Sequence, residues 1–211
     1  MRVALVNYGL GNLGSVRRAL EDLGADVVIA EKPAMLAGTD RIILPGVGAF
    51  KDGMARLHKD GWVDVIHREI EVHGKPLLGI CLGMQMLADS GDENGPNPGL
   101  GLIPGHVRRL DKLGCDLRIP HVGWNDVNYT RGFELFNNIP QGMDFYFVHS
   151  YAFDMVDSDW VTATTHYGVG VVAAVAKGHV FGTQFHPEKS SKAGKQILEN
   201  FLSYSPCSRF A

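Results

Sequence analysis

The sequence predicts an α/β fold: a doubly wound, mainly parallel sheet with added antiparallel strands in the C-terminal half. Two observations lead to this prediction. Up to residue 88, short apolar runs typical of buried strands alternate with longer runs that follow a helical period. After residue 106, short β-like runs follow one another directly. Alternating strands and helices build a parallel sheet, whose ligand-binding edge lies at the carboxyl ends of the strands.

The N-terminal half is expected to hold four strand-helix units. Its strands are expected over residues 3–6, 26–30, 41–44 and 75–80, and its helices after a glycine-bearing turn at 9–14, over 54–73 and over 84–88. Gly24 and Gly74 are expected to end the first two helices, because glycine readily takes the left-handed conformation found at helix C-termini.

The C-terminal half is expected to begin with a surface loop over residues 90–101, which is rich in Gly, Asn, Pro and acidic residues. Short strands are expected over 107–110, 118–129, 144–153, 160–167, 169–176 and 180–185, followed by a helix over 192–204 and a loose tail beyond 206. No linker, repeat or low-complexity segment interrupts the chain, so we expect residues 1–211 to form one domain.

Composition argues against several classes of function. A formal net charge of -3 and the lack of a long Lys/Arg-rich run argue against nucleic-acid binding. No apolar run approaches ~20 residues, so no transmembrane helix is expected. The three cysteines form no C-x-x-C pair, and the sequence starts with a strand-like run instead of a signal peptide, which favours a reducing, cytoplasmic location. The nine histidines lack zinc-site spacing, and we expect neither a metal nor a cofactor.

The stretch from Gly79 to Gly83 predicts a nucleophile. It has the form G-x-C-x-G between a strand-like and a helix-like run, where two glycines allow the strained turn that presents a central side chain at a sheet edge. The central residue is Cys81, and the start of a helix favours a reactive thiolate. A buried, inert cysteine is the alternative, because free cysteines are often buried.

A second stretch, residues 184–188, supplies a base and a carboxylate. His186 and Glu188 lie two residues apart in an extended segment, so their side chains point to the same side. Pro187 keeps His186 out of the helical region. We therefore expect His186 to face Cys81 as a general base, with Glu188 orienting the imidazole.

A third motif points to a different function. Gly9, Gly11 and Gly14 follow the first strand with the spacing G-x-G-x-x-G, and Glu31 follows the second strand where a ribose-binding acid would lie. This pattern is typical of dinucleotide-binding proteins, although it has many false positives and nothing downstream supplies hydride chemistry.

The motifs at 79–85 and 185–188 resemble those of class I glutamine amidotransferases, whose glutaminase domain uses a Cys-His-Glu triad on an α/β sheet. The loop at 45–48 is similar to the one that carries an oxyanion donor in that family. The segments 7–12, 120–125, 146–151 and 184–190 extend the resemblance over essentially the whole chain. It implies that the chain hydrolyses glutamine, and that the turn at 9–14 binds no nucleotide.

The resemblance also implies roles for further residues. Backbone N–H groups of Leu82 and of Val47 or Gly48 would bind the oxyanion. Gln85, Glu93, Ser150 and Tyr151 match substrate-binding positions, and Tyr8, Asn12, Trp124, Tyr146 and Lys189 match positions that face a partner.

The partner implied is a separate cyclase subunit with a (β/α)8 barrel, which receives the ammonia in histidine biosynthesis. Related glutaminases serve other synthases, including some that aminate sugars for surface polysaccharides, and this alternative stays open at the level of the sequence. A dinucleotide-binding protein and a non-enzymatic scaffold are weaker alternatives, since both leave the Cys, His and Glu pattern unexplained.

Overall fold

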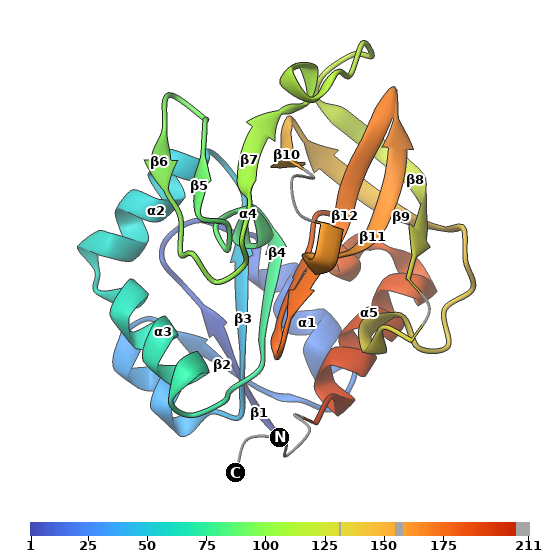
Figure 1. The fold of residues 1–211 in the computed structure, drawn as a ribbon. Helices are drawn as coiled ribbons and strands as arrows, with labels where there is room; N and C mark the ends of the chain where they lie inside the picture. The colour runs from blue at the N-terminus through green and yellow to red at the C-terminus, as the bar shows by residue number, and fades with distance from the viewer. Residues whose placement is uncertain (131, 155–157, 206–211) are drawn as a thin grey trace.

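A nine-stranded mixed sheet forms the centre of the protein (Figure 1), with strand order β2-β1-β3-β4-β13-β12-β11-β8-β9. The computed structural model describes residues 1–130, 132–154 and 158–205; the tail expected beyond residue 206, with Cys207, lies outside these ranges. Five neighbouring strands pair in parallel: β2 (Asp26–Ala30), β1 (Arg2–Val6), β3 (Arg41–Gly46), β4 (Leu77–Cys81) and β13 (Val180–Thr183). Antiparallel pairing adds β12 (Val169–Lys177), β11 (Val161–Tyr167), β8 (His121–Tyr129) and β9 (Met143–His149). The predicted fold class is confirmed.

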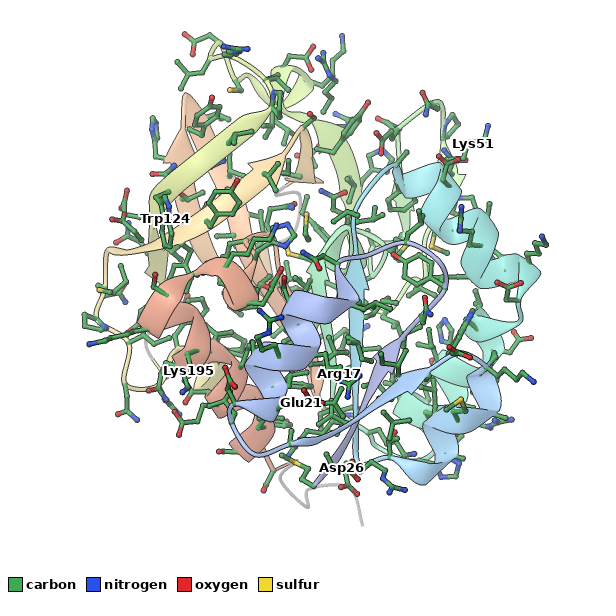
Figure 2. The ribbon with its side chains drawn as sticks, turned by 180° about the vertical axis from the view of Figure 1, so that it is seen from behind. Arg17, Glu21, Asp26, Lys51, Trp124 and Lys195 are labelled. Carbon is green, nitrogen blue, oxygen red and sulfur yellow. The ribbon has the colours of Figure 1, made fainter. Side chains whose placement is uncertain are left out.

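Helices cover both faces of the parallel strands. Figure 1 shows α2 (Phe50–Lys59) and α3 (Trp62–Glu71) together, and their apolar residues join the core formed by Ala4, Ile42 and Leu77. Figure 2 shows the opposite face, where α1 (Leu13–Glu21) and α5 (Ser191–Ser203) pack on a second core. One apolar stripe on each helix explains this arrangement, because burying that stripe against the sheet removes it from water.

A second, four-stranded sheet was not expected from the sequence. Its order is β10 (Tyr151–Asp154), β7 (His106–Arg109), β5 (Ser90–Gly91) and β6 (Asn97–Pro98). The segment predicted as a loop over 90–101 therefore contributes two very short strands. The single strand predicted over 144–153 is in fact two strands in two sheets, because the chain bends at Ser150.

Two helix predictions were wrong in detail. The helix expected over 54–73 begins at Phe50 and is broken into α2 and α3 by Gly61, whose φ of 73° is left-handed. The apolar period did not reveal this break, because both helices present their stripe to the same core. The helix expected over 84–88 is α4 (Leu82–Gln85), which starts directly after Cys81 and has only four residues.

Short 3-10 turns connect several elements: η1 (Pro33–Gly38), η2 (Leu110–Leu113), η3 (Glu134–Phe136), η4 (Ser158–Trp160) and η5 (Pro187–Lys189). Within the described ranges, none of the helices has the length and apolar character needed to cross a bilayer.

Gly83 brings α4 against β3, and a side chain there is predicted to destabilise the fold. A Cβ on Gly83 would overlap the Leu44 carbonyl oxygen, whereas a Cβ on Gly14 of α1 would meet no atom within 4 Å. We expect Gly83→Ala to lower the free energy of unfolding by about 3 kcal/mol or more, through overpacking against backbone. Gly14→Ala, the matched control, should raise it by about 0.5–1 kcal/mol. Urea denaturation measures both, and equal stabilities for the two variants would contradict this packing.

Candidate active site

One cavity of ≈ 330 Å³ lies at the carboxyl edge of the parallel strands, where β3 and β4 end and the segment after β13 begins. Its lining contains all but one of the residues that the sequence singled out for chemistry, the exception being Glu188: Val47, Gly48, Cys81, Leu82, Gln85, Glu93, Ser150, Tyr151 and His186. Pro120, Val148 and His149 also line it. This volume is at the small end of the range for small-molecule sites, about 300–1,000 Å³.

Cys81 occupies a strained turn at the end of β4. Its φ of 53° and ψ of -109° are rare for a residue other than glycine. The turn is possible because Gly79 leaves room for the helix: a Cβ on Gly79 would lie 2.7 Å from the backbone carbonyl carbon of Gly83. Strand, turn and α4 therefore have the geometry of a nucleophile elbow, as the sequence predicted.

His186 and Glu188 form a buried pair. His186 Nδ1 lies 2.8 Å from Glu188 Oε1, and both side chains are almost fully buried. Burial by itself lowers the pKa of His186, but hydrogen bonding and charge from Cys81 and Glu188 outweigh it and raise the pKa to about 9. The ring is therefore cationic at neutral pH, and its Nε2 carries a proton.

That proton points toward the thiol side of the cavity. His186 Nε2 is buried and makes no hydrogen bond of good geometry with the described residues, yet Cys81 is close enough to be the strongest influence that raises the pKa of this ring. Hydrogen bonds of catalytic groups are often loose without substrate and tighten in the complex. The Cys81 and His186 side chains are thus brought together as expected.

The sulfur of Cys81 has two further contacts, and neither was expected from the sequence. Gln184 Nε2 lies 3.7 Å from Sγ, and the carbonyl oxygen of Val148 lies 3.8 Å from Sγ. The extended segment expected to contain His186 and Glu188 was wrong: β13 ends at Thr183, and Glu188 lies in the 3-10 turn η5, so this turn and not strand alternation brings Glu188 to His186. Val148 and His149 come from a distant strand, β9, and no motif in the sequence marks them as neighbours of the thiol.

The residues expected to bind substrate also line the cavity. Glu93 Oε2 accepts a hydrogen bond from Phe50 N at the start of α2, at 2.7 Å. Gln85 is less available than expected, because its Nε2 donates to Tyr151 O at 2.8 Å and to Gln184 Oε1 at 3.0 Å. Both N–H groups of that amide are occupied, so only its oxygen remains for a substrate.

The loop after β3 lies beside the thiol. Val47 is 41% exposed, and Gly48 has a φ of 109°, a conformation that favours glycine. Leu82 is the first residue of α4, and all three residues line the cavity. Their backbone N–H groups belong to the loop and the turn that flank Cys81.

Three of the five residues expected to face a partner form one group at the surface, in which Trp124 and Lys189 are exposed and Tyr146 is half-buried. Trp124 and Tyr146 are opposite each other on β8 and β9, with ring centroids 6.0 Å apart, and Lys189 Nζ lies 5.7 Å from the Tyr146 ring. Figure 2 shows Trp124 on the outside of the sheet, above α5 and its Lys195. Asn12 is exposed and caps α1, accepting from Ser15 N.

Tyr8 does not belong to this group. It is 3% exposed, and its hydroxyl lies close to Gly46, inside the core. Burial, then the charge of Cys81, raises the pKa of Tyr8, while Arg56 opposes this shift. Direct contact with a partner does not fit such a position.

Two of the three glycines of the dinucleotide-like motif, Gly9 and Gly11, make room for protein atoms. Arg56 Nη1 donates to Gly9 O at 3.1 Å and fills the space that a Cβ on Gly9 would need, while Pro45 packs against Gly11. This observation weakens the dinucleotide alternative. Among the described residues, no group of three or more His, Cys, Asp or Glu side chains has an arrangement suited to a metal ion.

The chain belongs to the class I glutamine amidotransferase family, whose model matches residues 4–204. It is 47% identical, over 94% of this chain and 93% of the relative, to the imidazole glycerol phosphate synthase subunit HisH of Moorella thermoacetica. It is 44% identical to the protein of that name from Acinetobacter baylyi, over 97% and 98% of the two chains. Among solved structures, a glutamine amidotransferase aligns with a TM-score of 0.74 and 22% identity, over 95% and 96% of the two chains, a likeness in fold.

The charge on His186 is predicted to depend on Glu188. Because its pKa in the folded protein lies above the ordinary 6.5, the protonated ring stabilises the fold fully below pH 6.5, and this contribution disappears as the pH rises through about 9. Glu188→Gln should move the titration of His186 to lower pH by about 1 to 2 pH units, since it removes a charged hydrogen-bond partner. NMR titration of histidine-labelled protein measures this, and an unchanged midpoint would refute the pairing.

Proposed function

We propose that residues 1–211 form one glutaminase domain, the subunit of an imidazole glycerol phosphate synthase that hydrolyses L-glutamine to glutamate and ammonia. The observation that carries this proposal is the cavity in which Cys81 meets the His186 and Glu188 pair. The names of the two relatives described above support the synthase and favour histidine biosynthesis over sugar amination.

The proposed reaction starts with the Cys81 thiolate, which attacks the side-chain amide carbon of glutamine. Backbone N–H groups of Leu82 and of Val47 or Gly48 stabilise the oxyanion of the tetrahedral intermediate. His186 donates its Nε2 proton to the leaving nitrogen, so that ammonia departs and a thioester remains. The neutral ring then takes a proton from water, which cleaves the thioester to glutamate and restores the thiolate. Glu188 holds the ring in the required tautomer throughout.

The proposed substrate contacts follow from the lining of the cavity. Glu93 offers a carboxylate to the substrate amine, while the backbone of Ser150 and Tyr151 faces the substrate carboxylate. Gln85 contributes its free amide oxygen. No cofactor takes part in this scheme.

The proposed partner is a cyclase subunit with a (β/α)8 barrel, which receives the ammonia. Four outward residues on β8 and β9 support a docking surface, which we call the β8–β9 patch: Val122, Trp124, Tyr146 and Val148. Val122 and Trp124 are more than half exposed, an unusual degree for apolar side chains beside each other. Asn12 and Lys189 are proposed to add polar contacts at its margin. Buried Tyr8 is left out of this surface.

Cys81→Ala is predicted to abolish glutamate release in the presence of the cyclase subunit, with a fall of at least ~10⁴-fold, because the nucleophile is lost. Cys115→Ala is the matched control: this thiol is also buried and free, but it lies against Tyr167 O, outside the cavity. An enzymatic glutamate assay measures both variants. Activity that persists without Cys81 would disprove the mechanism.

The pathway is tested by complementation of a histidine auxotroph that lacks its glutaminase subunit. Growth with the wild-type chain and its cognate cyclase, but not with Cys81→Ala, is the expected result. Good expression of both chains without growth would favour a different synthase.

Trp124→Glu is predicted to weaken binding of the cyclase by about 30-fold or more, since a large aromatic residue at the centre of an interface commonly contributes more than 2 kcal/mol. Val72→Glu is the control, because Val72 is 72% exposed but lies just after α3, outside the β8–β9 patch. Isothermal titration calorimetry compares the two, and similar affinities would remove the β8–β9 patch from the interface.

A further inference from the structure

Three amide groups connected by hydrogen bonds lead from the cavity wall to the thiol: the Tyr151 backbone, the Gln85 side chain and the Gln184 side chain. Tyr151 O accepts from Gln85 Nε2 at 2.8 Å, and Gln184 Oε1 accepts from the same nitrogen at 3.0 Å. Gln184 Nε2 in turn lies 3.7 Å from Cys81 Sγ. Gln85 and Gln184 are both buried, Gln184 completely.

The Tyr151 carbonyl group fixes which atom of each side-chain amide donates and which accepts. A backbone carbonyl can only accept, so the Gln85 side chain must turn its nitrogen toward Tyr151. That nitrogen also faces Gln184, which must therefore present its oxygen to Gln85 and its nitrogen to the sulfur. An inverted Gln184 amide would place two donors against each other and an oxygen against the thiolate.

We propose that Gln184 is a positioning residue that donates a hydrogen bond to the Cys81 thiolate and is itself oriented by Gln85. The inference rests on the proposed role of Cys81 as nucleophile. The neutral thiol has a different partner, because its S–H group donates to Val148 O at 3.8 Å. Ionisation therefore exchanges one contact for another: the thiolate accepts from Gln184, and Val148 is released.

The four-residue length of α4 makes this donor important. The sequence suggested that a helix N-terminus would stabilise the thiolate, but a single turn has little of the dipole of a full helix. The titratable groups that face the sulfur are His186, with Glu188 behind it, and buried Tyr8 after β1. His149 and Glu93 lie further round the cavity. Of these neighbours only His186 is a cation, so a neutral donor on another side adds to its effect.

The test is the pH profile of Cys81 alkylation by iodoacetamide, measured without glutamine or partner by mass spectrometry of the Cys81 peptide. For Gln184→Met we expect about 3- to 10-fold slower alkylation near pH 7, a profile shifted to alkaline pH, and an unchanged rate at high pH. For Gln184→Glu the shift should be larger, because a carboxylate keeps the contact with Gln85 but turns an oxygen to the sulfur. If Gln184 only filled space, Gln184→Met should shift the alkylation profile more than Gln184→Glu, since Glu is closer to Gln in shape.

Gln196→Met is the matched control, because Gln196 is partly buried and bonds Asn200 in α5, away from the cavity. Wild-type profiles in both folded position-184 variants would overturn the proposal. If neither folds, Gln85→Met decides, since it releases the Gln184 amide from its orienting partner: an alkaline shift supports the proposal and an unchanged profile contradicts it. Alkylation needs no turnover, so this outcome is separate from the Cys81→Ala glutamate assay that tests the proposed function.

Discussion

The backbone turn at Cys81 is the constraint on which the rest of the structure depends. A non-glycine residue with positive φ costs on the order of 1–3 kcal/mol and persists only where its surroundings enforce it. Here, the enforcement comes from Gly79 and Gly83, which let α4 pack directly on β3 and β4. The register of β3, β4 and β13 then brings the loop after β3 and His186 to the same edge as the thiol. Strain at one residue is thus balanced by packing across three strands.

Two buried histidines that line the cavity, His149 and His186, differ in their pKa and therefore in their charge. Burial, with help from the neighbouring rings of His121 and His186, lowers the pKa of His149 to about 3, although its Nδ1 is 2.9 Å from Tyr151 O. His186 experiences the same burial but has Glu188 on one side and Cys81 on the other, so its pKa rises to about 9. One cavity therefore holds a neutral and a cationic imidazole at neutral pH. Specific charged partners, and not burial, decide which ring can transfer a proton.

The fold class and the turn at Cys81 could be predicted because they depend on local patterns. The strand and helix alternation is a property of short windows, and G-x-C-x-G requires its own turn. The second sheet could not be predicted in this way, since β5 and β6 have two residues each and exist through pairing with β7. The break at Gly61 was hidden by a continuous apolar stripe. The contacts of Val148 and Gln184 with the sulfur could not be predicted, because no motif in the sequence marks either residue as a neighbour of the thiol.

Strand β9 contributes side chains to the β8–β9 patch and backbone contacts to the residues around the thiol. Its side chains alternate, so Tyr146 and Val148 face outward while Phe145, Phe147 and His149 face inward. Its backbone holds the site directly: Tyr146 O accepts from His186 N at 2.9 Å, and Val148 O lies 3.8 Å from Cys81 Sγ. A partner that binds the patch would therefore contact the strand whose backbone lies against both Cys81 and His186. Glu93, in contrast, accepts a hydrogen bond from Phe50 N of α2. The proposed docking surface and the proposed chemistry therefore share one strand, and coupling between them needs no long pathway.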